Sequence, residues 1–186
     1  MARSIGEGLH QALEQAQTRP VPKSAGAQMR YLVRQLKGTK AVAQLLRVSQ
    51  RTVERYVKDQ IKKPRPELAA RMNREVQKRW QPRVKERAKK TAATTQGLVI
   101  DVRAQLGYDA PAGTTDEARL RHLTVALPPH HAARLFDAQD QGANDAALRK
   151  ITADALKEVY FQQSGTRAAG LEEVRMLDVE HVEFGL

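Results

Sequence analysis

The segment Thr39-Lys-Ala-Val-Ala-Gln-Leu-Leu-Arg-Val-Ser-Gln-Arg-Thr-Val-Glu-Arg-Tyr56 decides the fold of the N-terminal part of this chain. Thr39 and Ser49 each carry a side-chain oxygen of the kind that caps a helix N-terminus. They predict two short helices, over residues 40–46 and about 50–58. Two short helices so close in sequence are typical of a helix-turn-helix, whose second helix enters the major groove of DNA.

Small and apolar side chains at the crossing of the two helices support this interpretation. Ala43 provides the small residue, and the apolar residues are Leu46, Val48 and Val53. The turn position that often carries glycine is Arg47, where a left-handed backbone costs roughly 1 kcal/mol. The alternative is an ordinary three-helix bundle with a solvated basic face. The agreement of cap, small and apolar positions favours a helix-turn-helix over residues 39–58.

Burial of Val53 and Tyr56 leaves a polar face on the second helix. The side chains predicted to contact DNA are Ser49, Gln50, Arg51, Glu54, Arg55, Lys58, Lys62 and Lys63. Arginine pairs bidentately with guanine and glutamine with adenine, so Arg51 and Gln50 are the candidates for reading bases. We expect Arg55 and the three lysines to hold phosphates.

The basic residues are concentrated in the same N-terminal part of the chain. Residues 1–90 contain 23 Lys and Arg against 7 Asp and Glu, whereas residues 91–186 contain 9 against 14. A polyanionic partner is therefore expected for the first part only, and DNA, RNA and an anionic membrane surface satisfy the charge equally. Cysteine is absent, which excludes disulfides and fits a cytoplasmic protein. No apolar run approaches the roughly 18 residues of a membrane span.

The periodicity of the apolar residues predicts an α+β protein with two domains. Residues 1–90 form an all-helical, basic domain. Its expected helices are 4–17, one that Ser24 caps and that ends with Gly38 as its left-handed C-terminal residue, 40–46, 50–58 and 66–81. The boundary is expected near 88–96. Residues 97–186 form a small α+β domain with a few-stranded antiparallel sheet. Its expected strands lie near 98–104, 122–128 and 172–184, and its helices over 129–141 and 144–162.

Trp80 and the cationic stretch 67–90 each have two interpretations. The cations either track a DNA backbone or form a solvated helix surface. Trp80 lies on the apolar stripe that runs from Leu68 to Val84, which favours a core position, although an indole can also stack on an unpaired base.

Residues 107–117 form an irregular, glycine- and proline-containing loop that carries hydroxyl groups. Tyr108, Thr114 and Thr115 supply them, next to Asp109, Asp116 and Glu117. Spacing alone favours a structural explanation, in which Thr114 and Glu117 form a capping box that begins a short helix. Elsewhere, His130 and His131 are predicted to point to different sides of a helix start and to be exposed, so no metal site is expected.

Long runs of the chain closely resemble the terminal proteins of Streptomyces-type linear chromosomes and plasmids. The runs are Pro22–Tyr31, Gln35–Leu46, Ser49–Arg71, Lys78–Pro82, Gly113–Asp116, Arg121–Pro129 and Lys157–Phe161. The resemblance implies covalent attachment to the 5′ ends of telomeric DNA, where a protein hydroxyl replaces the primer 3′-OH. In that family the hydroxyl belongs to a threonine. The matching position is Thr114, with Thr115 as the second choice.

The same resemblance implies a protein primer that is not itself an enzyme. A threonine hydroxyl is a weak nucleophile, and the sequence contains no site that would activate it. A partner DNA polymerase would therefore supply that site together with Mg²⁺ and the dNTP, and no intrinsic cofactor is expected. The other expected partners are telomeric DNA and a telomere-associated recruiter protein, and self-association is compatible with the pattern. The expected location is the bacterial nucleoid, at chromosome ends in the cytoplasm.

Two other functions are compatible with the sequence. A transcriptional regulator would use the same DNA-binding half, with the α+β half as a dimerisation or effector module. It would bind a palindromic operator reversibly. A strand transferase with Tyr108 as the nucleophile would cleave DNA alone, but no basic or metal constellation supports it.

Overall fold

The alternating residues from Leu98 onward form the central strand of a three-stranded antiparallel sheet. The structure is a computed structural model that describes residues 4–109, 116–162 and 171–186. The sheet has the order β2-β1-β3, and its strands are β1 (Leu98–Asp109), β2 (Asp116–Leu127) and β3 (Glu173–Gly185). On one face of β1 every second side chain, from Ile100 to Leu106, is fully buried. The α+β class and the antiparallel sheet are therefore confirmed.

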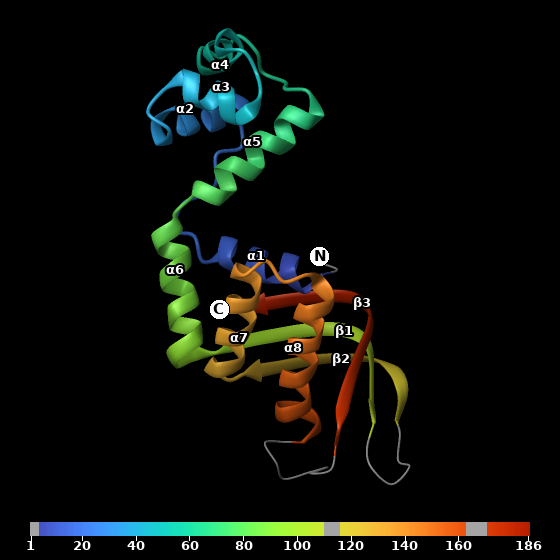
Figure 1. The fold of residues 1–186 in the computed structure, drawn as a ribbon. Helices are drawn as coiled ribbons and strands as arrows, with labels where there is room; N and C mark the ends of the chain where they lie inside the picture. Colours follow the sequence, from blue (N-terminus) through green and yellow to red (C-terminus); the bar gives the residue numbers. More distant parts are fainter. Residues whose placement is uncertain (1–3, 110–115, 163–170) are drawn as a thin grey trace. The chain divides into compact units, whose positions relative to one another are not determined.

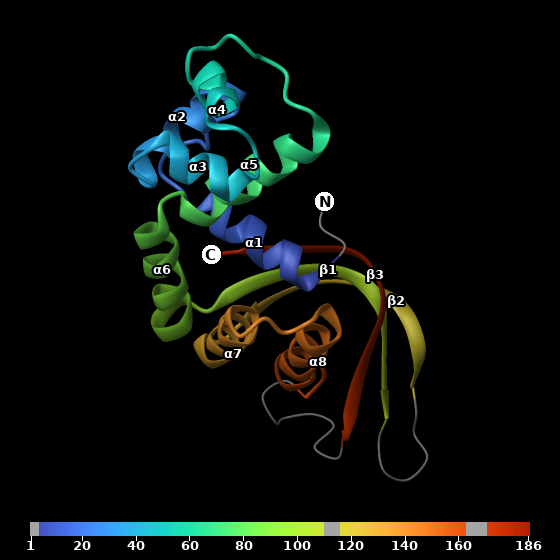
Figure 2. The same ribbon diagram turned by 45° about the horizontal axis from the view of Figure 1, so that its top comes forward.

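Helices cover that buried face. They are α1 (Ile5–Gln15), α7 (Pro129–Asp140) and α8 (Asp145–Leu156), and a π-helical turn, η2 (Lys157–Phe161), continues α8. Figure 2 shows the strands curving around α7 and α8. The other face of the sheet is open, and Val99, Leu120 and Leu177 on the strands are each nearly half exposed.

The expected basic helix over 66–81 ends two residues early. Helix α5 spans Pro66–Arg79, Trp80 is extended, and Gln81 has a φ of 45°. Pro82 then starts a separate helix, α6 (Pro82–Thr91), because proline is tolerated in the first turn, where its missing N–H has no partner to lose. A π-helical turn, η1 (Ala92–Gln96), joins α6 to β1. The cations of 67–90 are thus divided between two helices.

A second set of helices packs around its own core. It contains α2 (Ala25–Gln35), α3 (Thr39–Leu46), α4 (Gln50–Val57) and α5. The Ser24 and Ser49 caps are confirmed, because their Oγ atoms accept hydrogen bonds from the backbone N–H groups of Ala27 and Thr52, both at 3.2 Å.

Two expectations at the start of α3 are wrong by one residue. Gly38 is the N-cap and makes no side-chain bond, so Thr39 belongs to the helix and does not cap it. The left-handed residue after α2 is Lys37, at φ 56°, and the N–H of Gly38 closes the helix by bonding to Val33 O at 3.1 Å.

The chain divides into two compact units whose limits differ from the expected domains (Figure 1). One unit is Thr18–Pro82, and the other combines Met1–Gln17 with Arg83–Leu186. Helix α1 therefore belongs with the sheet, because Ile5 N donates to Asp145 Oδ1 at 2.9 Å and Gly8 lies against Phe184. The unit Thr18–Pro82 is an insertion between α1 and α6, which we call the inserted unit. Among the described residues, no helix is long and apolar enough to cross a membrane.

All of the excess positive charge of the chain lies in the inserted unit. It has 17 Lys and Arg against 4 Asp and Glu, whereas the rest of the chain has 15 against 17. The two ends of the unit are tied together: Thr18 N donates to Gln81 Oε1 at 3.0 Å, and Gln81 Nε2 donates to Thr18 Oγ1 at 3.3 Å.

Gly97, at the start of β1, gives a direct test of the fold. It has a φ of 74°, and a Cβ at this position would lie 2.1 Å from the backbone oxygen of Leu127. We expect Gly97→Ala to lower the free energy of unfolding by about 2–4 kcal/mol, because strand β1 or β2 must shift. Gly142 is the matched control, with a φ of 79° and nothing within 4 Å. Gly142→Ala should cost only about 1 kcal/mol. If denaturant titrations gave the two variants equal losses of unfolding free energy, the expected clash between residue 97 and the Leu127 carbonyl would be contradicted.

Candidate nucleic-acid interface

Helices α3 and α4 are joined by a three-residue turn, Arg47–Ser49. Arg47 has a φ of 53° and a ψ of 50°, so the predicted left-handed arginine is confirmed. The N–H of Val48 closes the turn by bonding to Ala43 O at 2.9 Å. Ala43, Leu46 and Val53 are buried. The turn and the buried side chains are as expected, and a DNA-binding helix-turn-helix remains a prediction.

The predicted contact residues gather on and beside the outer face of α4. Arg51 and Arg55 are exposed on the helix, and so are Lys58 at its C-cap and Lys62 and Lys63 in the segment before α5. None of these five cations forms an ion pair within the part of the chain that the structure describes. Five unpaired positive charges on one short stretch can each neutralise a phosphate without first breaking an internal contact.

Glu54 contacts its neighbour Gln50, and its predicted contact with DNA stays a prediction. Its carboxylate is half-buried, and its Oε1 accepts a hydrogen bond from Gln50 Nε2 at 2.9 Å. This contact uses one amide N–H of Gln50 and leaves the other N–H and the oxygen, which are the pair of groups that adenine recognition needs. Glu54 is therefore a positioning residue for Gln50. Ser49 is likewise occupied, because its Oγ caps α4 and lies 2.8 Å from Thr52 Oγ1.

Helix α2 holds the C-terminal end of α4. Arg30 Nη1 donates to Val57 O at 2.9 Å and to Asp59 Oδ2 at 2.6 Å. A Cβ on Gly26 would lie 1.9 Å from Asp59 Oδ1 and 3.1 Å from Tyr56 O, so a side chain here would displace the Asp59 carboxylate and crowd the Tyr56 carbonyl. Sequence reasoning missed these contacts, because the residues of each pair are about 30 positions apart.

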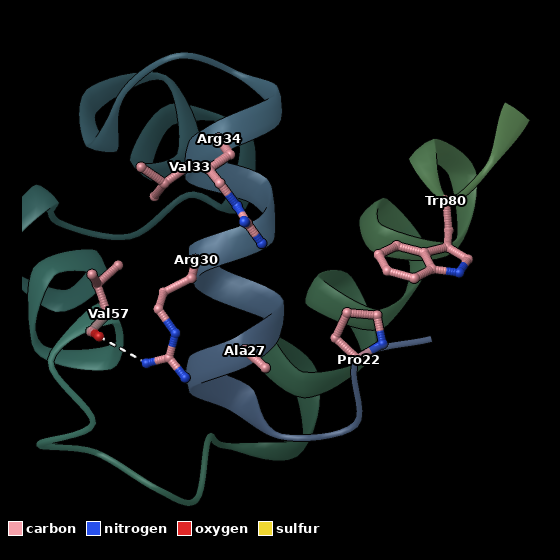
Figure 3. Close-up of a pocket in the computed structure, with 7 residues that line it drawn as sticks. All are labelled: Pro22, Ala27, Arg30, Val33, Arg34, Val57 and Trp80. Atoms are coloured by element: carbon pink, nitrogen blue, oxygen red, sulfur yellow. Dashed lines mark hydrogen bonds between the residues drawn. The ribbon is translucent and has the colours of Figure 1, made fainter. Parts of the chain in front are cut away.

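A groove of about 500 Å³ lies beside α2, as Figure 3 shows. Its lining residues are Pro22, Ala27, Arg30, Val33, Arg34, Val57 and Trp80. Trp80 is half-buried: its ring packs edge-on against Tyr31 with centroids 4.8 Å apart, and its Nε1 donates to Arg19 O at 3.1 Å. The expected core position is thus only partly correct, because the indole also borders the groove.

The predicted attachment residues, Thr114 and Thr115, lie outside the described residues. Strand β1 ends at Asp109 and β2 begins at Asp116. Glu117 is in β2, so the short helix expected to begin with a capping box there is wrong. Beside this end of the hairpin, Asp109 forms an ion pair with Arg175 at 3.1 Å, and the ring of Tyr108 packs against Phe161.

The expectation for the two histidines is correct for the exposure of His130 and wrong for His131. His131 is buried to 1% exposure, and its ring centroid lies only 4.0 Å from that of His130. Although adjacent side chains leave a helix about 100° apart, both rings reach the same group, Glu158 on η2. Burial lowers the pKa of His131, and the neighbouring His130 lowers it further.

Comparison with family profiles, with characterised proteins and with solved structures finds no match to this chain. The resemblance to terminal proteins therefore rests on the sequence runs quoted above.

Arg51 and Lys58 give distinguishable predictions for DNA binding. We expect Arg51→Ala to weaken binding to the cognate sequence by about 1–3 kcal/mol and to relax sequence preference, because a base contact would be lost. Lys58→Ala should weaken binding to all sequences and reduce the salt slope by about 1.

Fluorescence-anisotropy titrations over a range of salt concentrations measure both effects. Arg134→Ala is the control, since Arg134 is an exposed arginine on α7, outside the inserted unit. An unchanged affinity of Arg51→Ala at fixed salt would remove this residue from the interface.

Proposed function

We propose that this chain is a telomere terminal protein that binds the ends of a linear replicon and primes DNA synthesis from its own threonine hydroxyl. The observation that carries the proposal is the sequence resemblance, which includes both the α3–α4 region and Gly113–Asp116. The charge distribution supports it, because a unit with a net charge of +13 is joined to a remainder with a net charge of −2. Such a division suits a protein that holds a polyanion through one unit only.

In this proposal the inserted unit holds the telomere end. Arg51 and Gln50 read bases from the first turn of α4, and Glu54 keeps the Gln50 amide oriented. Arg55, Lys58, Lys62 and Lys63 contact phosphates. The recruiter protein brings the complex to chromosome ends, in the nucleoid of the bacterial cytoplasm.

The chemical step is nucleotidyl transfer to a threonine. The Oγ of Thr114 attacks the α-phosphorus of a dNTP, the bond to the β-phosphate oxygen breaks, and pyrophosphate leaves. The hydroxyl proton passes to a base. The DNA polymerase supplies this base and the Mg²⁺ ions, since a neutral hydroxyl is a weak nucleophile. The chain is thus a substrate and primer, and the nucleotide that it carries offers the 3′-OH for extension.

The second candidate is a transcriptional regulator. The observation that favours it is the open face of the sheet, where Val99, Leu120 and Leu177 are 46–47% exposed. A second copy could cover these side chains and give a dimer with two DNA-binding units. This function requires a palindromic operator and reversible binding. The strand transferase is less well supported, because the Tyr108 ring is half-buried against Phe161.

A labelling experiment tests the proposal. The protein is incubated with telomeric template, the recruiter, the polymerase, Mg²⁺ and α-labelled dNTPs, and is then run on a denaturing gel. We expect label that survives denaturation and maps to the peptide containing residues 108–117. Thr114→Ala should lose most of the label while its affinity for telomeric DNA stays nearly unchanged. Thr114→Ser should retain label, because it keeps the hydroxyl.

Thr115→Ala is the matched control and should label normally. Loss of label in Thr115→Ala alone would move the attachment site to Thr115. If the wild-type protein takes up no label while recruiter and polymerase are active, the proposal is wrong and the regulator becomes the better assignment.

A further inference from the structure

Three potential ligands converge where α7 begins and α8 ends. His130 Nε2 lies 3.5 Å from Glu158 Oε1, and His131 Nε2 lies 3.1 Å from Glu158 Oε2. One donor atom from each of the three residues lies within 4.8 Å of the others. Two imidazoles and one carboxylate are the protein ligands of several catalytic zinc sites, in which water takes the remaining position.

The unsatisfied nitrogens of His131 are a second, independent observation. Its side chain is 2% exposed, and neither ring nitrogen has a hydrogen-bond partner among the described residues. A buried polar atom without a partner costs free energy, so it needs an explanation. The Nε2 atom is close to Glu158 Oε2, but the two groups do not have the alignment of a hydrogen bond.

The separations of the ligand atoms fit a metal ion better than a shared proton. In a tetrahedral site with bonds of 2.0–2.2 Å, neighbouring ligand atoms lie about 3.4 Å apart. The two nitrogen–oxygen distances here, 3.1 and 3.5 Å, lie on either side of that value. A proton in a hydrogen bond lies near the line between nitrogen and oxygen. A metal ion bound to both atoms lies well off that line: at these bond lengths, the angle at the nitrogen between the oxygen and the metal is about 40°. A cation bound between the two groups would account for a buried imidazole nitrogen that has no hydrogen-bond partner among the described residues.

Glu158 owes its position to an irregular backbone. Helix α8 is α-helical up to Leu156, and Lys157–Phe161 then forms a π-helical turn, closed by Gln162 N bonding to Lys157 O at 2.8 Å. Such turns are rare and recur at functional sites, because the extra residue redirects side chains. Arg134, a cation that acts on His131, is paired with Asp154 at 3.3 Å.

We propose that His130, His131 and Glu158 form a binding site for a divalent transition metal, with zinc as the best match and one coordination position left for water or a ligand. Two imidazole nitrogens and one carboxylate do not suit Mg²⁺, which prefers six oxygen ligands. The metal would join the first turn of α7 to the π-helical turn after α8. The site does not depend on the function proposed above.

Metal binding by the full chain, without DNA or polymerase, tests this site. Zinc affinity is measured by competition with a chromophoric chelator, and coordination by the visible spectrum of the Co²⁺ form. We expect one zinc ion per chain, the intense Co²⁺ bands of a four-coordinate site, and no competition from excess Mg²⁺. His130→Ala and Glu158→Gln, both at exposed positions, should each weaken binding by about 100-fold or more, since each removes one of three ligands.

Two further variants serve as controls. Glu158→His replaces one ligand with another and should keep tight binding, as a three-histidine site. His10→Ala removes a histidine that also lies near a carboxylate, Glu14 at 3.3 Å, but that belongs to no group of three potential ligands among the described residues, so its zinc affinity should equal that of the wild type. Far-UV circular dichroism checks that all variants are folded. The proposal is overturned if the wild type binds no stoichiometric zinc, or if His130→Ala and Glu158→Gln bind it as the wild type does.

Discussion

The burial of one face of β1 is the constraint on which the larger unit depends. Ile100, Val102, Ala104 and Leu106 are all fully buried, and the strand is hydrogen-bonded along both edges, to β2 and β3. Because the side-chain period of a strand is two, a one-residue slip would place this whole set in solvent, so the register is strongly fixed. The helices that cover the set come from both ends of the chain: α1 precedes the inserted unit, and α7 and α8 follow β2.

Local patterns predicted most helices and all three strands, but not which core each element joins. The stripe of Ile5, Leu9 and Leu13 correctly indicated a helix. Any amphipathic helix has such a stripe, and only a contact across 140 residues, Ile5 to Asp145, assigns α1 to the sheet. The division of the chain was therefore not predictable from periodicity. Ion pairs between distant residues were not predictable either. Lys89 lies within a run of cations, which indicates a solvated side chain, yet it pairs with Asp140 at 2.6 Å.

How far each candidate site was predictable depended on whether its residues lie on one helix or come from distant segments. The exposed face of α4 followed from the burial of Val53 and Tyr56, which is a property of one helix. The Gln50–Glu54 contact is an i,i+4 pair and was within reach of the same reasoning. The histidine cluster was not, because its third member lies 27 positions after His131 and is turned toward it by a π-helical turn that no sequence pattern marked.

The interrupted larger unit has a consequence for synthesis on the ribosome. Residues 18–82 have their core partners within the same short stretch, so this unit can fold as soon as it emerges. Helix α1 emerges before the inserted unit but finds Phe184 and Val182 of β3 only after more than 160 further residues. At 5–20 residues per second the delay is roughly 10–30 s. Throughout that time the apolar stripe of α1 is without its native cover, so a helix that is made before the inserted unit docks after that unit has folded.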